Sequence, residues 1–545
     1  MCGIICVIQY YNGLDMNVMM QCLSKLTARG PDASNYKVIT YDNVTIFMGF
    51  TRLAIMDTSD AGMQPFTDAN GNYVICNGEI YNYKDLASKY DIDMHSDCDC
   101  EILLPLFNKI GMTDMVGFEL DAEFATVIFD KNCHTIYAAR DKYGVRPLYY
   151  GYNSRTGTIA FASELKALHP IMEHIEQVVP NFIYNIDLDK TDITSINRTS
   201  YFEYSHLTSD SQLTDVNYIH SQIRYLLTAS VQKRLCADRP IGFLLSGGLD
   251  SSLIVSIASR ILGVDKIVCF SVGLEHSPDV MAAKTVAEYL GINQHYIIPF
   301  TTDMGIASLP EVIEAIETYD ITTIRASTPQ YIMAKYISTH YNIKVLLSGE
   351  GSDEIHGSYR YFRDAPDPIQ FHDECIRLLQ ELYYFDNKRT DRTMADNGLE
   401  VRVPWLDHSY VKFITSIDPT LLMYRENYME KQIVRDSFVG YLPPEILYRS
   451  KEAFSDAVSS NEINWAKAIQ NHAALIIDDD ILANNTYTIN KPVTKDALYF
   501  RNIFNRFYCG RDNIIPHYWL PRFQSEPVVD PSARILRSYQ SNQSN

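Results

Sequence analysis

The sequence predicts two domains of different fold class. Over the first 190 residues, short apolar segments alternate with tight turns, which is typical of an α+β domain built on antiparallel sheets. From about residue 214, compact apolar strands alternate with helical segments, which indicates an α/β domain with a parallel sheet. Beyond about residue 370 the pattern is largely helical. We therefore expect domains at residues 2–190 and 214–545, joined by a linker at residues 191–213.

The first domain opens with the apolar run Ile4–Ile8, which predicts a buried strand. A second strand is expected at residues 73–76, because it ends at the turn signal Asn77-Gly78. Residues 124–129 and 135–139 predict two paired strands, since polar turn residues lie between them. The polar stretch that follows, at residues 187–212, supports the linker.

The second domain opens with an amphipathic helix marked by Ile219, Ile223 and Leu227. Strands and helices then alternate, so crossover helices and a parallel sheet are expected. The expected strands cover residues 241–245, 266–272 and 344–347, and the expected helices cover residues 251–262 and 280–290.

Composition excludes several classes of protein. The chain has 545 residues, 46% of them hydrophobic, so it can bury a sizeable core and is not disordered as a whole. Lys and Arg number 47 against 67 Asp and Glu, which gives a formal net charge of −20. So acidic a chain is a poor nonspecific ligand of nucleic acid or anionic membrane, and we expect neither as a partner.

Cysteine usage and the distribution of apolar residues indicate the cellular compartment of the protein. The 11 cysteines are scattered and odd in number, which favours a reduced protein over a disulfide scaffold. No charged leader precedes Lys25, the first basic residue, and no apolar run reaches the roughly 18 residues of a membrane helix. We therefore expect a cytoplasmic protein.

Cys2 is a candidate nucleophile. If Met1 is removed, Cys2 carries both a thiol and a free α-amine, whose pKa of about 7.7–8.0 allows it to act as a base at neutral pH. A terminal amine that activates its own side chain is a known route to a working nucleophile. Taken alone, a cysteine at position two is more often just a small residue, so the neighbouring motifs decide.

Those motifs supply what an amino-acid amide substrate needs. The planar guanidinium of Arg52 can bind a carboxylate, and Glu79 and Asp99 can hold an ammonium group. The Asn77 side chain and the Gly78 N–H can form an oxyanion hole for an attacked amide carbonyl. Each residue alone has an ordinary structural explanation: an arginine is usually a surface charge, and Asn-Gly is usually only a turn.

The segments MCGI, RLAIMD, CNGEIYN, DCEIL, ARDKYGVRPLYYG and FASELKAL resemble the glutaminase domain of class II (N-terminal nucleophile) glutamine amidotransferases. The resemblance implies a four-layer αββα sandwich in which Cys2 hydrolyses glutamine to glutamate and ammonia. It also implies a set of glutamine-binding residues: Arg52, Leu53, Ala54, Ile55, Met56, Asn77, Gly78, Glu79 and Asp99. One departure is Pro105, which would kink a helix that started at Asp99.

A candidate phosphate-binding loop, Ser246–Ser252, follows the strand at 241–245 and opens a helix. Its glycines allow backbone N–H groups to approach phosphate, the helix N-terminus favours negative charge, and Ser246, Ser251 and Ser252 add hydroxyl donors. Asp250 is an unusual neighbour for phosphate unless a cation lies between them, and Mg²⁺ is the usual choice. The loop does not match the Walker A pattern.

A second glycine-rich turn, Ser348–Glu354, follows the strand at 344–347. Asp353 could share the metal with Asp250, and Glu350 is a candidate general base. Lys451 could stabilise charge on a pentavalent phosphorus. The alternatives are a solvated acidic loop and a lysine in a surface ion pair.

The segments PIGFLLSGGLDSS, CFSVGL, ETYDITTIRASTP, LLSGEGSDE, NGLEVRVPWLD and YRSKEAFSDAV resemble the synthetase domain of the asparagine synthetase B family, a kind of ATP pyrophosphatase. The resemblance implies that Glu350 and Lys451 are catalytic and that Asp250 and Asp353 bind Mg²⁺. It implies an ATP site of Leu245, Ser246, Gly247, Gly248, Asp250, Ser251, Val272, Ser348 and Gly349. Thr322, Thr323, Arg325 and Glu354 would bind aspartate or the β-aspartyl-AMP intermediate.

The two resemblances imply one overall reaction, in which aspartate, ATP and glutamine give asparagine, AMP, pyrophosphate and glutamate. Ammonia released in water is mostly ammonium, so we expect an internal route from Cys2 to Asp250. Two alternatives stay open: a relative that amidates another carboxylate or closes a β-lactam ring, and a regulatory protein without catalysis. The family often forms homodimers, which is an expectation by analogy.

Overall fold

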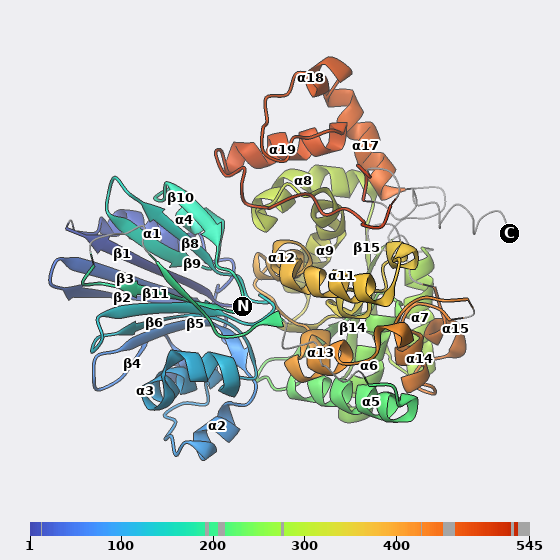
Figure 1. The fold of residues 1–545 in the computed structure, drawn as a ribbon, viewed down its shortest axis with the longest axis horizontal. Helices are drawn as coiled ribbons and strands as arrows, with labels where there is room; N and C mark the ends of the chain where they lie inside the picture. Colours follow the sequence, from blue (N-terminus) through green and yellow to red (C-terminus); the bar gives the residue numbers. More distant parts are fainter. Residues whose placement is uncertain are drawn as a thin grey trace. The chain divides into compact units, whose positions relative to one another are not determined.

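The computed structural model describes residues 1–11, 13–190, 196–204, 213–273, 277–426, 428–450, 464–524 and 528–531. The chain forms two compact units (Figure 1). The first unit comprises Met1–Glu203, Cys236–Pro240 and Met394–Glu400, and the second comprises Tyr204–Leu235, Ile241–Thr393 and Val401–Asn545.

The first unit contains two antiparallel sheets, each of six strands among the described residues. One sheet has the order β10 (His174–Gln177), β8 (Tyr149–Asn153), β9 (Thr158–Ala162), β1 (Gly3–Tyr10), β3 (Val44–Arg52) and β2 (Ala33–Tyr41). The other has the order β12 (Asn197–Ser200), β11 (Phe182–Asp187), β7 (Thr135–Arg140), β6 (Ala122–Asp130), β5 (Tyr73–Ile80) and β4 (Phe66–Thr67).

The two sheets pack face to face and helices cover their outer faces. On β1, Ile4, Cys6 and Ile8 belong to the core between the sheets, where they meet residues of β5, β6 and β7. Ile5 lies on the opposite face of the same strand, next to Leu23 of α1, because successive side chains of a strand alternate. Figure 1 shows α1 (Met16–Ser24) and α4 (Leu165–Leu168) over the first sheet and α2 (Tyr83–Lys89) and α3 (Leu103–Asp114) over the second. The unit is therefore the expected αββα sandwich.

Two sequence predictions are adjusted in this unit. Asn197–Ser200 lies inside the expected linker, but it pairs with β11 and extends the first unit to Glu203. The helix after Asp99 begins only at Leu103, behind a 3₁₀ turn at Asp99–Ile102, so Pro105 falls in its first turn. A proline costs little there because that N–H would lack a helical partner anyway.

The second unit is built on a five-stranded sheet with the order β15 (Gln294–Pro299), β14 (Val268–Gly273), β13 (Ile241–Leu244), β16 (Val345–Leu347) and β17 (Glu400–Arg402). The pairings β13–β14, β13–β16 and β14–β15 are parallel, as the strand–helix alternation predicts. Because parallel strands end at the same edge, the loops after β13 and β16 lie side by side.

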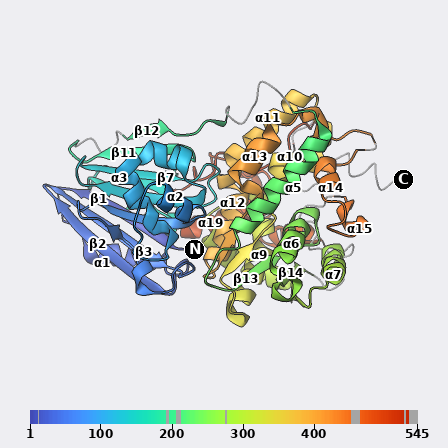
Figure 2. The same cartoon turned by 90° about the horizontal axis from the view of Figure 1, so that it is seen from below.

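Helices complete the second unit. Figure 2 shows α6 and α7 beside β14. The largely helical character predicted beyond residue 370 is confirmed for the described residues. The helices of the unit are α5 (Val216–Lys233), α6 (Leu249–Leu262), α7 (Pro278–Leu290), α8 (Thr302–Ile316), α9 (Ile321–His340), α10 (Ser352–His356), α11 (Pro368–Glu381), α12 (Asp386–Ala395), α13 (His408–Thr415), α14 (Gln432–Ser437), α15 (Pro444–Leu447), α17 (Trp465–Ile476), α18 (Asp479–Ala483) and α19 (Lys495–Phe507).

Candidate active sites

Cys2 stands at the start of β1, where two contacts hold it. The Arg29 Nε donates a hydrogen bond of 2.9 Å to the Cys2 carbonyl oxygen. The Cys2 thiol lies 3.7 Å from the carbonyl oxygen of Leu53. Because Gly3 pairs with Thr51 of β3, the strand that leads into the predicted glutamine-binding segment 52–56 runs beside the nucleophile.

Burial favours the protonated, unreactive form of the Cys2 thiol, whereas the charge of the Met1 amine lowers the pKa of that thiol. Burial raises the pKa of the Cys2 thiol to about 11 and lowers the pKa of the Met1 amine to about 6. The Met1 side chain is fully buried, with its sulfur 2.6 Å from the Arg146 Nη1 and 3.9 Å from the Arg29 Nη2. A thioether is a weak hydrogen-bond acceptor, so this position suits a polar group better than a methionine. That mismatch supports removal of Met1.

The candidate oxyanion hole lies on β5. The Asn77 side chain is 1% exposed, and neither its amide nitrogen nor its amide oxygen has a hydrogen-bond partner among the described residues. A buried amide without a partner costs free energy, so such a group points to a ligand. At Gly78, a Cβ atom would lie 2.5 Å from the Glu123 carbonyl oxygen, so only glycine fits.

The residues expected to hold the substrate carboxylate and ammonium are placed by their own neighbours. The Arg52 guanidinium donates to the carbonyl oxygens of Ser59 and Asp57. Asp99 accepts a hydrogen bond of 2.6 Å from the Ile80 N–H, which joins it to the end of β5 beside the buried Glu79. The structure therefore groups Asn77, Gly78, Glu79 and Asp99 around one strand end.

The phosphate-binding loop connects β13 to α6. Gly248 caps α6 without any side-chain hydrogen bond, so the first N–H groups of the helix keep their donor capacity. The Ser246 and Ser251 hydroxyl oxygens lie 2.9 Å apart. Gly247 has a φ of +78°, and a Cβ there would lie 2.5 Å from the Ala283 nitrogen. Ser252 is buried and does not line the cavity, contrary to the expectation for its hydroxyl.

The loop after β16 lies directly against the first loop. A Cβ on Gly349 would lie 2.7 Å from the Ser251 nitrogen, so the two backbones are in close contact. Together the loops open into a cavity of about 210 Å³. Twelve of the predicted residues line it: Leu245, Ser246, Gly248, Asp250, Ser251, Val272, Thr322, Ser348, Gly349, Glu350, Asp353 and Glu354.

The two carboxylates expected to bind a metal converge on a lysine. The Lys431 Nζ lies 2.7 Å from Asp250 Oδ1 and 2.7 Å from Asp353 Oδ1. No group of three or more His, Cys, Asp or Glu side chains that could hold a metal ion occurs in the described part of the chain. Two carboxylates beside a phosphate-binding loop nevertheless fit Mg²⁺, which is usually held by one or two carboxylates together with substrate phosphates.

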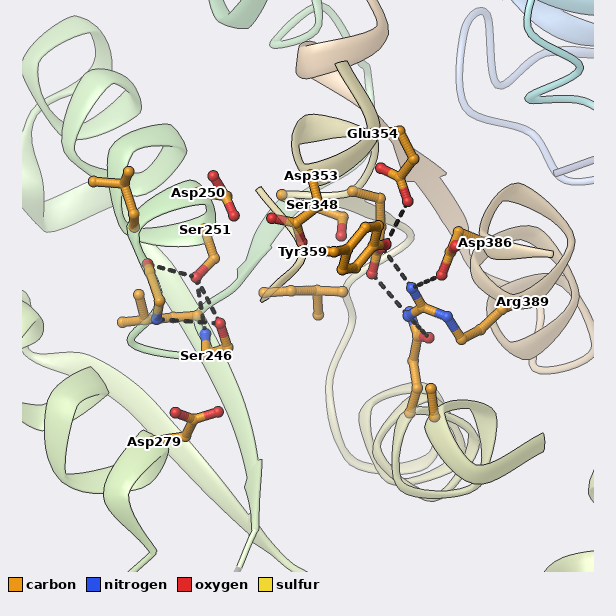
Figure 3. Close-up of a pocket in the computed structure, with 18 of the residues that line it drawn as sticks. Ser246, Asp250, Ser251, Asp279, Ser348, Asp353, Glu354, Tyr359, Asp386 and Arg389 are labelled. Atoms are coloured by element: carbon orange, nitrogen blue, oxygen red, sulfur yellow. Dashed lines mark hydrogen bonds and ion pairs between the residues drawn. The ribbon is translucent and has the colours of Figure 1, made fainter. Parts of the chain in front are cut away.

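A second polar cluster forms the opposite side of the cavity (Figure 3). Arg389 binds both carboxylate oxygens of Glu350, at 2.9 and 2.6 Å, and also reaches Asp386 at 2.7 Å. Tyr359 donates a hydrogen bond of 2.5 Å to Glu354. Burial, together with the charges of Asp386 and Asp353, raises the pKa of Glu354 well above its usual range. The cluster therefore presents a fixed carboxylate and a carboxyl group that favours its neutral form.

Four predicted residues are not placed at the cavity. Gly247 belongs to the loop but is not one of the residues that line the cavity. The Thr323 hydroxyl and N–H both bind Asp320 at 2.8 Å, and Arg325 is 3% exposed and paired with Asp496 and Asp530 at 2.7 and 2.9 Å. Asp320 therefore caps α9 by accepting from Thr323, and Arg325 holds distant segments together. Lys451 lies outside the described residues.

Sequence reasoning missed polar residues that line the cavity, and Tyr359, Arg389 and Lys431 are three of them. None of them stands in a glycine-rich turn or at the end of a strand. Each is a single polar residue in a helical or irregular segment, where no local pattern separates it from a surface residue.

Among the described residues, no helix is both long enough and apolar enough to cross a membrane.

Comparisons with known proteins match both halves of the chain. A family model described as "Glutamine amidotransferase domain" matches residues 1–219, and one described as "Asparagine synthase" matches residues 222–370 and 365–513. A protein of Acanthamoeba polyphaga mimivirus named "Probable asparagine synthetase [glutamine-hydrolyzing]" is 62% identical, over 98% of this chain and 100% of its own length. The asparagine synthetases (glutamine-hydrolysing) of Cricetulus griseus and Homo sapiens are 38% and 37% identical, over 99% of each chain.

Proposed function

Because the chain belongs to the family of glutamine-hydrolysing asparagine synthetases, we propose that it converts aspartate, ATP and glutamine into asparagine, AMP, pyrophosphate and glutamate. The observation that supports the proposal is the presence of two candidate sites on one chain. One contains the Cys2 thiol and, on β5, a buried Asn77 amide without a partner among the described residues, and the other has a phosphate-binding loop beside fixed carboxylates.

In the first unit the reaction is an acyl transfer. The Cys2 thiolate attacks the side-chain amide of glutamine, and the Cys2 amine, freed by removal of Met1, moves the proton to the leaving ammonia. Asn77 and the Gly78 N–H stabilise the oxyanion. Arg52 binds the substrate carboxylate, which requires it to release the carbonyl oxygens of the 57–59 loop, and Glu79 and Asp99 bind the ammonium group. Water then releases glutamate from the thioester.

In the second unit the reaction is an adenylation followed by an amination. The phosphate-binding loop and the helix N-terminus hold the triphosphate of ATP, with Leu245, Val272, Ser348 and Gly349 around the nucleotide. A side-chain carboxylate oxygen of aspartate attacks the α-phosphorus and pyrophosphate leaves. Ammonia then attacks the activated carbonyl carbon, Glu350 accepts the proton and AMP leaves. Lys451 would stabilise the charge on the phosphate.

Asp250 and Asp353 are the residues that would hold Mg²⁺. When bound there, the cation would neutralise charge on the phosphates and so stabilise pyrophosphate as a leaving group. Thr322, Thr323, Arg325 and Glu354 are retained as candidates for the aspartate site. The positions of Thr323 and Arg325 favour an indirect role, through α9 and its ion pairs.

The test compares the unaltered protein with Cys2→Ala. With aspartate, ATP and Mg²⁺, the unaltered protein should form asparagine from glutamine or from ammonia. Cys2→Ala should lose the reaction with glutamine and keep the reaction with ammonia, because it removes only the nucleophile. Product analysis by mass spectrometry measures both reactions.

Two results would contradict the proposal. If the unaltered protein forms no asparagine with aspartate as the acceptor, the substrate is another carboxylate. If Cys2→Ala also loses synthesis from ammonia, the two sites are not separate.

The cytoplasmic location and the homodimer stay predictions. Cell fractionation and light scattering of the purified chain would test them.

A further inference from the structure

Lys431 is an unusual residue in an unusual place. Its side chain is 2% exposed, and lysine is among the residues that are least often fully buried unless they are paired. Its backbone has a φ of +55°, the left-handed region that side chains other than glycine rarely adopt. Strained backbone conformations persist where the surrounding structure demands them, and they cluster at functional sites. Lys431 is one of the residues that line the cavity.

The Lys431 ammonium group occupies carboxylate oxygens to which a metal ion would also bind. Its two contacts, both of 2.7 Å, go to the Oδ1 atoms of Asp250 and Asp353. The same Oδ1 atoms accept hydrogen bonds from two serine hydroxyls, Ser352 to Asp250 at 2.8 Å and Ser358 to Asp353 at 2.5 Å. Each Oδ1 atom therefore already has two donors.

Among the described residues, the acidic neighbour of Lys431 in the chain is already engaged by other cations. The preceding Glu430 is bound by Arg363 and Arg435, at 3.4 and 3.3 Å. The pair Asp250 and Asp353 would repel each other in a buried site if Lys431 were absent. The positive charge of Lys431 between them relieves this repulsion when no nucleotide is bound.

We propose that Lys431 is a built-in counter-ion that holds Asp250 and Asp353 in place and keeps divalent cations out until the triphosphate enters. The ammonium group and a divalent cation compete for the same carboxylates, so the cation binds weakly to the empty site. A triphosphate brings several negative charges, and Lys431 can then move from the carboxylates to phosphate oxygens. The metal consequently binds together with the nucleotide. This inference rests on the proposed function, because it takes ATP as the ligand.

The first experiment measures binding and not catalysis. Mn²⁺ and pyrophosphate are titrated separately into the unaltered protein, Lys431→Met and a control, Lys335→Met. Lys335 is a surface lysine paired with Glu311 on α8. Lys431→Met should bind free Mn²⁺ at least about tenfold more tightly and pyrophosphate at least about tenfold more weakly, because one change frees two carboxylates and removes a phosphate partner. Lys335→Met should change neither affinity.

Opposite shifts in the affinities for Mn²⁺ and pyrophosphate distinguish the proposed counter-ion role of Lys431 from a purely structural role. A Lys431→Met protein with unchanged or weaker Mn²⁺ binding would overturn the inference, as would unchanged pyrophosphate binding. The thermal unfolding midpoint of each variant shows whether it is folded.

A second experiment needs no variant. Electron paramagnetic resonance of Mn²⁺ with the unaltered protein should detect no tightly bound ion alone and one per chain with an ATP analogue that carries a methylene group between the α- and β-phosphorus. One tightly bound Mn²⁺ per chain without nucleotide would overturn the inference. Asparagine formation is measured in parallel, so failure of the proposed function is recognised separately.

Discussion

Two buried amides of the first unit differ in how their hydrogen-bonding groups are used. Gln64 donates to the Cys76 carbonyl oxygen at 3.2 Å and accepts from the Cys76 N–H at 2.6 Å, so it continues the hydrogen bonding of β5. Asn77 follows Cys76 on β5, and its side chain makes no hydrogen bond to another described residue. The first amide supports the fold, and the second has the unused hydrogen-bonding capacity that its proposed role requires.

Asn77→Ala should therefore impair catalysis, whereas Gln64→Ala should impair stability. Asn77→Ala should lower kcat for glutamine hydrolysis by about 10²–10³-fold, because it removes one oxyanion donor, and should leave the free energy of unfolding nearly unchanged. Gln64→Ala should lower the free energy of unfolding by about 1–3 kcal/mol, since it leaves buried backbone groups of Cys76 without partners. Steady-state kinetics and denaturant unfolding measure the two effects. Equal losses of stability would contradict the catalytic role of Asn77.

Cys2 provides a prediction about pH. A thiol with a raised pKa loses its proton only at high pH, and the thiolate is the reactive form. In a chain that keeps Met1, the pKa of about 11 means that alkylation of Cys2 by iodoacetamide should rise about tenfold per pH unit and level off near pH 11. Mass spectrometry follows the reaction, with the exposed Cys509 as the internal reference. A plateau already at neutral pH would show that burial does not raise the pKa of the Cys2 thiol in this chain.

At the scale of elements, the second site depends on two loops whose backbones touch. The loops after β13 and β16 meet because their strands are parallel neighbours, and glycine makes the close approach possible at Gly349. Gly247 plays a different part, since it brings the first loop against α7. The geometry of the phosphate site is thus set by how closely the elements pack behind it.

Gly247 and Gly263 have similar φ angles but different surroundings, so substitutions at the two positions separate the effect of backbone strain from the effect of packing. Gly247 has a φ of +78° and no room for a Cβ, whereas Gly263, with a φ of +86°, has nothing within 4 Å of that position. Gly263→Ala should cost about 1 kcal/mol of unfolding free energy from strain alone. Gly247→Ala should cost about 2 kcal/mol or more and should also raise the KM for ATP, because the Ala283 backbone cannot yield easily. Denaturant unfolding and ATP-dependent release of pyrophosphate measure both variants, and equal effects would refute the packing argument.

For the whole molecule, the essential feature is that the two proposed reactions belong to two different compact units. Ammonia that escaped into water at neutral pH would become ammonium, which is not a nucleophile. The acyl adenylate would meanwhile be exposed to hydrolysis. The protected transfer of ammonia that we expect would avoid both losses.

Isotope dilution tests this transfer. During turnover of unlabelled glutamine with ¹⁵N-ammonia in the solvent, the asparagine formed should contain little ¹⁵N. Cys2→Ala under the same conditions should incorporate ¹⁵N fully, which shows that the label can be used. Free entry of the label into the product of the unaltered protein would exclude a protected route.

Local patterns were sufficient for much of the molecule. The strand Ile241–Leu244 and the loop after it were predictable because apolar runs, glycines and hydroxyls act over a few residues. The candidate oxyanion residues were predictable for the same reason, since Asn77 and Gly78 are adjacent. The linker was predicted less well: Asn197–Ser200 is polar and exposed, yet it forms a strand because β11 offers it a free edge.

The sequence by itself determined the two fold classes and the two chemistries, because each depends on residues that are neighbours in the chain. Only the tertiary structure decided which charges meet. Arg325 was expected at the substrate but pairs with Asp496 and Asp530, while Lys431 and Arg389 reach the cavity from segments without any motif. The physical reason is that long charged side chains are paired by proximity in space, and the chain brings them together across more than a hundred residues only when it folds.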